Sequence, residues 1–462
     1  MKFEFNREQW YNLRDDRTKR IESVQDFSNY SVGVVVNPRI ENSFALQCMV
    51  LLSCNMLARW CRKITIDMVD CNTILPNQKN ESFNTMIKEQ LAQIDPLGDF
   101  NFHEVNESAV GQVLIIGENE KKFSKSSIWL NGSGWISGVG VGNNIRTIED
   151  GTINPIGPAF ASCLGVAATF KHAVNDESTT QYHKWYSLYD LNSSVNPQEL
   201  NNPPLSTQLD FGTIFQIGCG AVGSSLDYLL SLTNWKAKFH LIDFDKIEYS
   251  NCSSSLTFVP QFVQENKMKV DVCQEILESN EKEVEPIPKS YNDFTGTSEY
   301  AQSNPDIILC LANEQNVWST IQDSYPPLVF HATTTKNWAL NFGRHIPTKE
   351  WCILCRFSDQ LTDNFHPKCA EGIISTKDGG KEILGTLPFL SPAGSVLVLA
   401  ELAKVHLNDF PINKNFVEFS MKPPFGNIVT QRGQKKGCIC NDQSFNLYKQ
   451  FRGNSKFWSV TA

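Results

Sequence analysis

The stretch TIFQIGCGAVGSSLDYLLSLTNWKAKFHLIDFDKIEYSN, residues 213–251, decides the fold of this chain. It begins with a short apolar run, Thr213–Ile217, that has the length and β-branching of a buried parallel strand. Three turn glycines follow directly: Gly218, Gly220 and Gly223. A leucine-rich helical pattern comes next, and a second apolar run, Lys238–Ile242, ends at Asp243.

Strand, glycine turn, helix, strand and acid, in this order, predict a nucleotide site of the dinucleotide-binding type. The glycines permit a tight turn and a close approach of the backbone to phosphate, and the helix N-terminus offers unpaired N–H groups to anionic oxygens. Asp243 is placed to accept a hydrogen bond from a ribose hydroxyl. Glycines alone also serve turns that bind nothing, so the prediction rests on the pattern around them.

Composition and net charge limit the number of domains, the partners and the cellular location to be expected. The 462 residues allow about two to four domains with an ample core. A net charge of −9 argues against a nucleic-acid or acidic-membrane partner. The 14 cysteines and the charged, polar beginning MKFEFNREQW predict reduced thiols, no signal peptide and a cytoplasmic location. The longest apolar helical pattern, Phe44–Trp60, is too short and too polar for a membrane span.

The first part of the chain repeats the strand–helix–strand order without the glycine turn. Strands are predicted at Ser31–Val36 and Lys63–Val69, with the helix Phe44–Trp60 between them. Asn37-Pro-Arg39 stands where the glycines would be. This part therefore reads as an α/β domain that has lost its phosphate loop.

The predicted fold class is α/β, with two Rossmann-like halves. The first half, residues 1–203, is degenerate, and the second half, residues 204–462, has an intact glycine loop. Within the first half, residues 70–110 are polar and predict loops. The polar, proline-containing residues 175–208 predict the connection between the halves. In the second half, Glu265–Leu277 predicts a helix that carries Lys267 and Lys269.

Two close cysteine pairs predict a structural zinc site. Cys352 and Cys355 have the standard C-x-x-C spacing, and Cys438 and Cys440 are one residue closer than usual. Four thiolates can hold one tetrahedral Zn²⁺, which would tie the end of the chain to its core. The pairs could instead be small buried hydrophobes or a redox centre, but no thioredoxin-like strand and helix flank the C-x-x-C.

A polar, loop-like stretch over about residues 358–386 contains Cys369 next to Lys368. A neighbouring cation lowers the pKa of a thiol and raises the thiolate population that a nucleophile requires. A lone loop cysteine is nevertheless more often inert than catalytic. Its loop position sets it apart from the cysteines that lie in or beside predicted strands and helices: Cys219, Cys252, Cys273 and Cys310.

Several of these features form one set, in order and in spacing. The set consists of the glycine turn, Leu241-Ile-Asp243-Phe-Asp245, Ser250-Asn251, Lys267-Met-Lys269, the C-x-x-C at 352–355 and Cys369-Ala-Glu. It resembles the ThiF-type adenylyltransferases, the ubiquitin-activating enzymes and their bacterial sulfur-carrier-activating relatives, over roughly residues 205–445. The first half resembles, more loosely, the inactive adenylation half of the ubiquitin-activating enzymes. Such a two-half chain is similar to the activating enzymes of bacterial ubiquitin-like conjugation operons, which are linked to phage defence.

The resemblance implies roles for individual residues. It implies ATP and Mg²⁺ as cofactors, with binding residues Gly218, Gly220, Gly223, Asp243, Asp245, Asn251, Lys267, Lys269, Asn313 and Glu314. Of the two lysines, Lys269 is favoured for the triphosphate and Lys267 is the fallback. An arginine from the first half, Arg14 or Arg17, would reach the same phosphates, and Cys369 would receive the activated carboxyl group.

Two positions depart from the pattern of the family. The family's arginine three residues after Asn251 is Ser254 here, and its magnesium-binding aspartate falls on Ala312. Either Asn313 or Glu314 takes over the metal, or adenylation is impaired.

The sequence therefore predicts an enzyme that activates a ubiquitin-like protein, a β-grasp carrier ending in glycine. Adenylation of the carrier, a thioester on Cys369 and transfer to a conjugating enzyme would follow in this order, and a homodimer is compatible with this prediction. The alternatives are a sulfur-carrier adenylyltransferase and a catalytically impaired binding scaffold. An NAD-dependent oxidoreductase would fit the glycine turn and Asp243, but it has no use for the cysteine quartet, Asn251 or Lys269.

Overall fold

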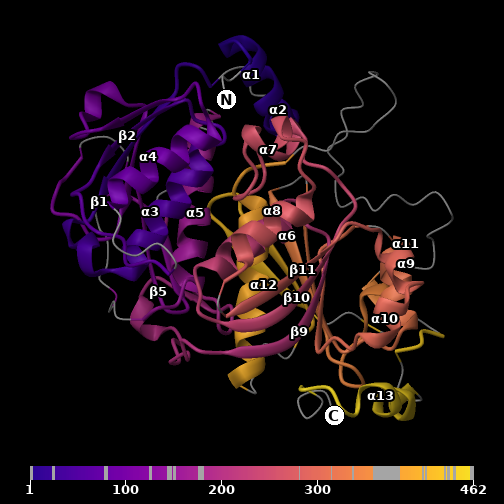
Figure 1. Cartoon of the computed structure of the whole chain (residues 1–462). Coiled ribbons are helices and arrows are strands. Elements are labelled where there is room, and N and C mark those ends of the chain that lie inside the picture. Colours follow the sequence, from indigo (N-terminus) through magenta and orange to yellow (C-terminus); the bar gives the residue numbers. More distant parts are fainter. Residues whose placement is uncertain are drawn as a thin grey trace.

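The chain folds into two α/β halves that lie side by side, the first on the left and the second on the right in Figure 1. The computed structural model describes residues 4–22, 27–76, 82–123, 127–142, 148, 152–174, 182–279, 281–313, 315–335, 338–356, 386–407, 410–411, 414–430, 433, 437–440 and 444–457.

The first half is built on an eight-stranded sheet with the order β3-β2-β1-β4-β5-β6-β7-β8. Neighbours from β3 to β5 in this order are parallel, and the last three strands join antiparallel. The strands are β1 (Ser31–Val36), β2 (Lys63–Asp67), β3 (Asp99–Phe102), β4 (Gln112–Ile116), β5 (Ile128–Ser133), β6 (Ile136–Val141), β7 (His183–Ser187) and β8 (Ser193–Ser194).

The second half repeats this arrangement with the order β11-β10-β9-β12-β13-β14-β15-β16. Here too the neighbours from β11 to β13 are parallel and the last three strands are antiparallel. The strands are β9 (Asp210–Ile217), β10 (Lys236–Ile242), β11 (Lys282–Ile287), β12 (Ile307–Cys310), β13 (Leu328–Thr334), β14 (Ala339–His345), β15 (Phe416–Ser420) and β16 (Gly426–Thr430). The predicted fold class, two Rossmann-like halves, is confirmed.

Helices cover the sheets and form the contact between the halves. They are α1 (Arg7–Arg14), α2 (Asp16–Glu22), α3 (Phe44–Ala58), α4 (Phe83–Ile94), α5 (Ile156–Ala173), α6 (Ala221–Ser231), α7 (Pro260–Gln264), α8 (Lys269–Leu277), α9 (Tyr291–Thr295), α10 (Ser298–Gln302), α11 (Gln315–Asp323), α12 (Leu390–Leu407) and α13 (Phe445–Arg452). The start of α3 shows why such a helix begins where it does: the Ser43 hydroxyl accepts the Leu46 N–H at 3.0 Å and caps the first turn.

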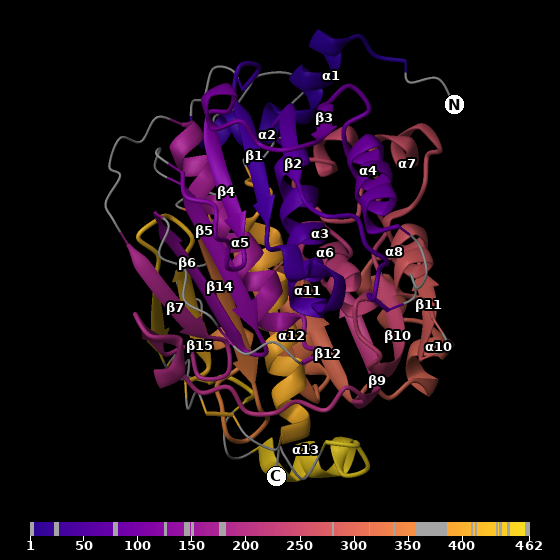
Figure 2. The same cartoon turned by 90° about the vertical axis from the view of Figure 1, so that its left-hand side faces the viewer.

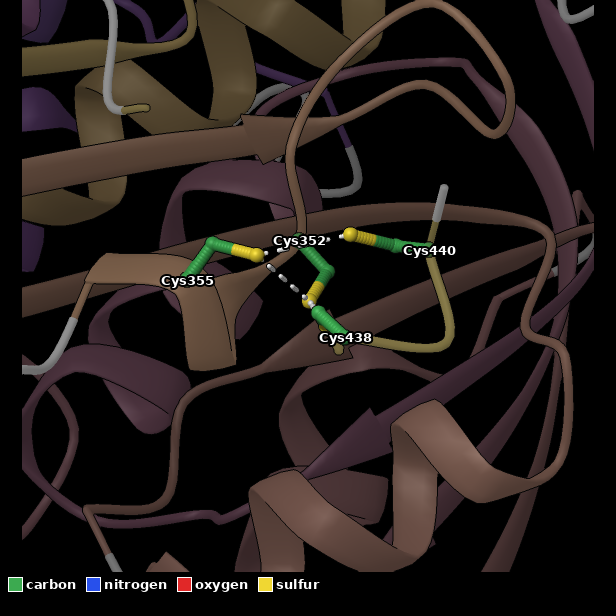
Figure 3. Close-up of side chains that lie close together, drawn as sticks. All are labelled: Cys352, Cys355, Cys438 and Cys440. Atoms are coloured by element: carbon green, nitrogen blue, oxygen red, sulfur yellow. Dashed lines mark hydrogen bonds between the residues drawn. The ribbon is translucent and has the colours of Figure 1, made fainter. Parts of the chain in front are cut away.

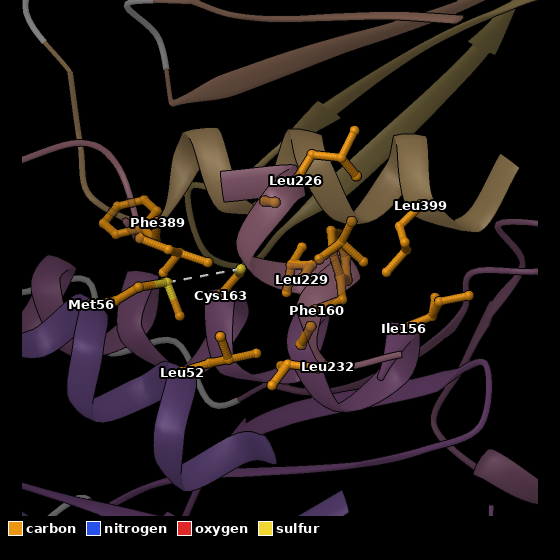
Figure 4. Close-up of a cluster of buried hydrophobic side chains, with 14 of the residues drawn as sticks. Leu52, Met56, Ile156, Phe160, Cys163, Leu226, Leu229, Leu232, Phe389 and Leu399 are labelled. Atoms are coloured by element: carbon orange, nitrogen blue, oxygen red, sulfur yellow. Dashed lines mark hydrogen bonds between the residues drawn. The ribbon is translucent and has the colours of Figure 1, made fainter. Parts of the chain in front are cut away.

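Four helices build one apolar core that belongs to both halves. Helices α3 and α5 come from the first half and α6 and α12 from the second, and they crowd together in the middle of the molecule (Figures 1 and 2). Every residue of α3 is buried, including the polar Gln47, Ser53 and Asn55, because apolar residues predominate on all sides of the helix. Leucine, methionine and phenylalanine side chains from all four helices meet in this core (Figure 4).

One described helix, α12, is long and apolar enough by composition to cross a membrane. In the fold, 89% of it is buried inside the protein between α5, α6 and the second sheet. A core helix of this kind passes the same length and composition test as a membrane span, so α12 is weak evidence for membrane insertion.

Three sequence predictions about local structure are wrong. Residues 70–110 contain α4 and β3 instead of loops alone, because Phe83, Ile87, Leu91 and Ile94 form a buried helical stripe among polar neighbours. The stretch 175–208 is more than a connection, since β7 and β8 pair onto the edge of the first sheet.

The third error concerns the start of α8. The sequence predicts one helix that carries both lysines of Lys267-Met-Lys269, but α8 begins at Lys269, with Met268 in extended conformation before it. Lys267 therefore precedes the helix, and the two side chains leave the backbone in different surroundings.

Candidate active site

The glycine turn lies where the connections of the second sheet change direction. Strand β9 is flanked by β10 on one side and β12 on the other, and ligands of doubly wound sheets bind at the carboxyl end of this switch point. Gly218 has φ +100°, and a Cβ there would lie 2.9 Å from the Ala312 nitrogen. A Cβ on Gly223 would overlap the Gly218 carbonyl, whereas one on Gly220 would project into open space. The turn is thus closely packed at Gly218 and Gly223. It is accessible at Gly220, the residue before the first turn of α6, where a phosphate could approach the backbone N–H groups.

Asp243 ties the end of β10 to the glycine turn. One carboxylate oxygen accepts the Cys219 N–H at 2.8 Å, and the other accepts the Asp245 N–H at 2.8 Å. Burial raises the pKa of Asp243, although Lys269 and the two N–H bonds act in the opposite direction. The carboxylate therefore shapes the turn, and its contact with a ribose hydroxyl stays a prediction.

The structure separates the two candidate lysines. Lys269 Nζ lies 2.6 Å from Asp245 Oδ2, and its side chain is only 10% exposed, beside the strand-end acids. Lys267 instead pairs with Glu275 at 2.7 Å and with Glu265 at 3.7 Å. Exposed pairs of this kind contribute about 0–1 kcal/mol. The position of Lys269 next to Asp243 and Asp245 supports its preference over Lys267.

Asn251 ends a short 3-10 turn after β10, Tyr249–Asn251, and Ser254 lies in the turn that follows it. The Asn251 amide oxygen accepts the Glu248 N–H at 2.8 Å, so this side chain holds the turn together. Ser254 is buried, and its hydroxyl donates to the Asn251 carbonyl at 3.4 Å. The turn itself therefore provides no cation at position 254.

The N-terminal segment of the first half lies against this turn, and its two candidate arginines differ sharply. Arg17 Nη2 donates to Ser250 Oγ at 3.1 Å, next to Asn251. Arg14 is buried and paired with Asp15 at 2.7 Å and Asp95 at 2.6 Å, inside the first half. Arg14 is engaged within the first half, so of the two candidate arginines it is Arg17 that reaches the second half beside Asn251.

Aromatic packing holds the N-terminal segment in this position. The Trp10 ring of α1 meets the Tyr249 ring at 6.3 Å, and the Phe5 ring meets it at 5.0 Å. Trp10 Nε1 also donates to Asp95 at 2.8 Å, which anchors α1 to the first half. The segment therefore bridges the two halves at the candidate site.

The position expected to bind magnesium is Ala312, at the end of β12. Its carbonyl accepts from Trp318 Nε1 at 3.0 Å, so the backbone here is fixed. Asn313 follows and is exposed, while Glu314 lies outside the described residues. Asn313 and Asp245 offer the oxygen donors that Mg²⁺ prefers.

The same edge of the first sheet cannot cradle phosphate in this way. Pro38 has no N–H, and the Asn37 side chain accepts the Arg39 N–H at 2.8 Å. Counted from the strand pairing, Val69 stands where the second half has Asp243, and it is exposed. A cavity of about 460 Å³ remains at this edge, lined by Arg39, Asp67 and Lys121 among others. It has neither the glycine turn nor an acid at the position equivalent to Asp243.

The four predicted zinc ligands come together (Figure 3). The Cys352 and Cys355 sulfurs are 3.8 Å apart, Cys352 and Cys438 are 3.4 Å apart, and Cys355 and Cys440 are 3.4 Å apart. Tetrahedral zinc with Zn–S bonds of about 2.3 Å separates its sulfurs by about 3.8 Å. The geometry therefore fits a zinc site with four cysteine ligands.

A buried ionic network that the sequence did not reveal lies next to the segment that carries Cys352 and Cys355. Arg344 of β14 pairs with Glu350 at 2.6 Å and with Glu401 of α12 at 2.8 Å, and Lys404 pairs with Glu401 at 2.6 Å. Burial alone would lower the pKa of Arg344, but Glu401 and Glu350 raise it. Through Arg344, the network connects Glu350, two residues before Cys352, to helix α12.

Cys369 lies outside the described residues, but both ends of its segment are placed. Cys355 precedes the segment, and Thr386 follows it. The Thr386 N–H donates to the Arg17 carbonyl at 3.3 Å. The described residues on either side of the predicted cysteine loop therefore lie at the cysteine quartet and against α2.

Comparisons with known proteins agree with this architecture. The model of the ThiF family matches residues 203–438, and that of the BilD N-terminal domain matches residues 31–185. No curated protein matches the chain.

Solved structures of MccB are similar to the chain at low identity. A crystal structure of E. coli MccB is 18% identical, with a TM-score of 0.39, over 49% of this chain and 64% of that one. E. coli MccB with ATP is 16% identical, with a TM-score of 0.36, over 49% and 65%. The microcin C7 biosynthetic enzyme MccB in complex with N-formylated MccA is 14% identical, with a TM-score of 0.37, over 69% and 98%. The chain spans just under two thirds of the E. coli MccB chain that heads the comparison, 66%.

Proposed function

Because this chain belongs to the ThiF family of adenylyltransferases, we propose that it activates a ubiquitin-like protein with ATP and passes it to a conjugating enzyme. The carrier would be a β-grasp protein ending in glycine, and the setting would be a cytoplasmic conjugation system that acts in antiphage defence. The observation that supports this most is the contact of Arg17 with Ser250. It brings the degenerate first half to the 3-10 turn Tyr249–Asn251 of the second half, as a fused, two-half activating enzyme requires.

The reaction would have two chemical steps. In the first, a carboxylate oxygen of the carrier's C-terminus attacks the α-phosphorus of ATP, and the bond to the β-phosphate oxygen breaks to release pyrophosphate. In the second, the Cys369 thiolate attacks the carbonyl carbon of the acyl-adenylate, and AMP leaves with the bonding electron pair. The chain's own contribution is positioning and charge: N–H groups of the glycine turn, Lys269 and Arg17 face the phosphates. Mg²⁺ bound through Asp245 and Asn313 or Glu314 would neutralise phosphate charge.

Carrier-dependent exchange of radioactive pyrophosphate into ATP tests the proposal. The carrier would be a small ubiquitin-like protein encoded beside the gene of this chain. Exchange that requires the carrier and its terminal glycine is the expected result. Exchange without a thiol-sensitive adduct would favour the sulfur-carrier alternative.

One observation favours a second function, a binding scaffold without turnover. Ala312 places no carboxylate at the expected magnesium position, and its carbonyl is fixed by Trp318. In this case the chain would bind the carrier but show no exchange with it.

Arg17→Ala should reduce exchange by roughly tenfold or more, because a charged contact with phosphate is lost. The protein should keep its melting temperature, since Arg17 is only partly buried. Arg7→Ala is the matched control: Arg7 lies on the same segment, but its guanidinium donates to Leu97 in the first half at 2.9 Å. Equal exchange in the Arg17 variant and the control would mean that Arg17 only joins the two halves and does not contact phosphate.

Cys369→Ala should leave pyrophosphate exchange intact and abolish the carrier adduct that a reducing agent cleaves on a gel. The two steps separate because only the second uses a nucleophile. Cys71→Ala serves as the control, since Cys71 is a partly exposed cysteine of the first half. If the Cys369 variant still forms the adduct, another cysteine is the acceptor.

A further inference from the structure

A buried arginine of the first half holds a loop of the second half. Arg59 follows the end of α3 and is fully buried. Its guanidinium donates to the backbone oxygens of Leu256 at 2.8 Å and Phe258 at 2.9 Å, and also to that of Cys252. Asn55, one turn earlier, accepts from Arg59 Nε at 2.8 Å and donates to the Leu256 oxygen at 3.0 Å. The 252–258 loop is therefore clamped by α3.

The 252–258 loop is bonded in turn to the start of α6. Ser224 Oγ donates to the Gly220 carbonyl at 2.6 Å and lies 2.6 Å from Ser255 Oγ. A hydroxyl has one proton, so Ser255 is the donor in the second contact. The Leu256 N–H donates to Ser225 Oγ at 3.1 Å. A continuous chain of hydrogen bonds thus leads from Arg59 to the glycine turn.

Arg59 has an unusual charge environment. Within the described part of the chain, no carboxylate pairs with it, whereas the buried Arg14 and Arg344 each contact two carboxylates. Burial lowers the pKa of Arg59 to about 10, so it remains a cation at neutral pH. A buried cation that is hydrogen-bonded but has no counter-charge is costly. An anion bound at the nearby N-terminus of α6 would offset that cost, because Coulomb interactions are strong inside protein.

We propose that Arg59 is a positioning residue for ATP: it holds the 252–258 loop against α6 and adds positive charge behind the glycine turn. The proposal rests on the proposed function, since ATP is the ligand. It also gives the degenerate half a second role besides that of Arg17. The 252–258 loop carries Ser254 at the position where the family resemblance implies an arginine. The guanidinium of Arg59, at the end of α3 in the first half, binds the backbone of the same loop.

Calorimetry of ATP binding to the full-length chain, without any carrier, tests the proposal. Arg59→Gln should weaken binding by roughly tenfold or more, the effect of losing one ordinary charged interaction. Arg59→Lys keeps the charge and should retain more affinity than Arg59→Gln. The matched control is Arg452→Gln. Arg452 is a buried arginine of α13, at the opposite end of the molecule from α1 (Figure 1), and it donates to the carbonyl of Tyr325 at 2.8 Å. The control should bind ATP as the wild type does.

Wild-type affinity in a folded Arg59→Gln protein would overturn the proposal. An equal loss in Arg452→Gln would also overturn it, because the effect would then be general destabilisation. Equal losses in Arg59→Lys and Arg59→Gln would overturn its electrostatic part. If Arg59→Gln does not fold, hydrogen exchange of the wild type decides: ATP should slow exchange in the 252–258 loop, and unchanged exchange would refute the clamp. A wild type that binds no ATP would refute the proposed function as well.

Discussion

Replacing Lys269 by alanine should reduce carrier-dependent pyrophosphate exchange by at least about 100-fold, the usual effect of removing one preorganised charge-stabilising donor. The reason is its location: Lys269 Nζ is 2.6 Å from Asp245 in a nearly buried position beside the glycine turn. When the triphosphate binds, this ammonium group can exchange its carboxylate partner for phosphate oxygens. The measurement is the initial rate of exchange at saturating ATP and carrier.

Lys267→Ala is the matched control, since it removes the same charge two residues away. Its partners are Glu265 and Glu275, and it should lower exchange less than about twofold, as expected for an exposed ion pair. A greater loss in the Lys267 variant than in the Lys269 variant would reverse the assignment of the two lysines.

Replacing Cys438 by serine should remove about one zinc ion per chain and lower the free energy of unfolding by at least about 3 kcal/mol. Structural zinc binds zinc-finger peptides with about 10–16 kcal/mol, so losing one of four ligands has a large effect even in a fold with its own core. The four sulfurs lie within 4.8 Å of one another and join the chain after β14 to the chain before α13. Native mass spectrometry and denaturant unfolding measure the two effects.

Cys71→Ser provides the comparison for this variant, because Cys71 is exposed to a similar degree as Cys438 but lies in the first half. It should keep the zinc and most of the stability. A wild-type protein that contains no metal after purification without chelators would contradict the zinc assignment.

The glycine turn and its flanking strands could be predicted because their signals are local. The apolar run before Gly218, the turn and the acid after β10 occupy consecutive residues, and the strands fall where these patterns lie. Strands β7 and β8 could not be predicted in this way. Apart from Trp185 and Tyr186 their residues are polar, and these short strands form where the edge of the first sheet offers them backbone partners.

The sequence also could not decide whether Arg14 or Arg17 lies at the candidate site. Arg14 and Arg17 lie on adjacent short helices with similar neighbours, and only tertiary contacts send one to Asp95 and the other to Ser250. Arg59 gave no signal either, since a cation at the end of a helix is typical of favourable interaction with the helix dipole. Its partners in the second half are far away in the sequence, for example Leu256 at a separation of 197.

The core shared by α3, α5, α6 and α12 has a consequence for synthesis. Helix α5 is complete at Ala173, whereas α12, which packs beside it, is complete only at Leu407. At the usual rate of translation, roughly 230 residues take about 12–46 s. During this interval the nascent first half displays apolar helix surfaces to solvent, where chaperones or aggregation compete for them. A chain that ends before α12 would therefore leave the shared core open to solvent.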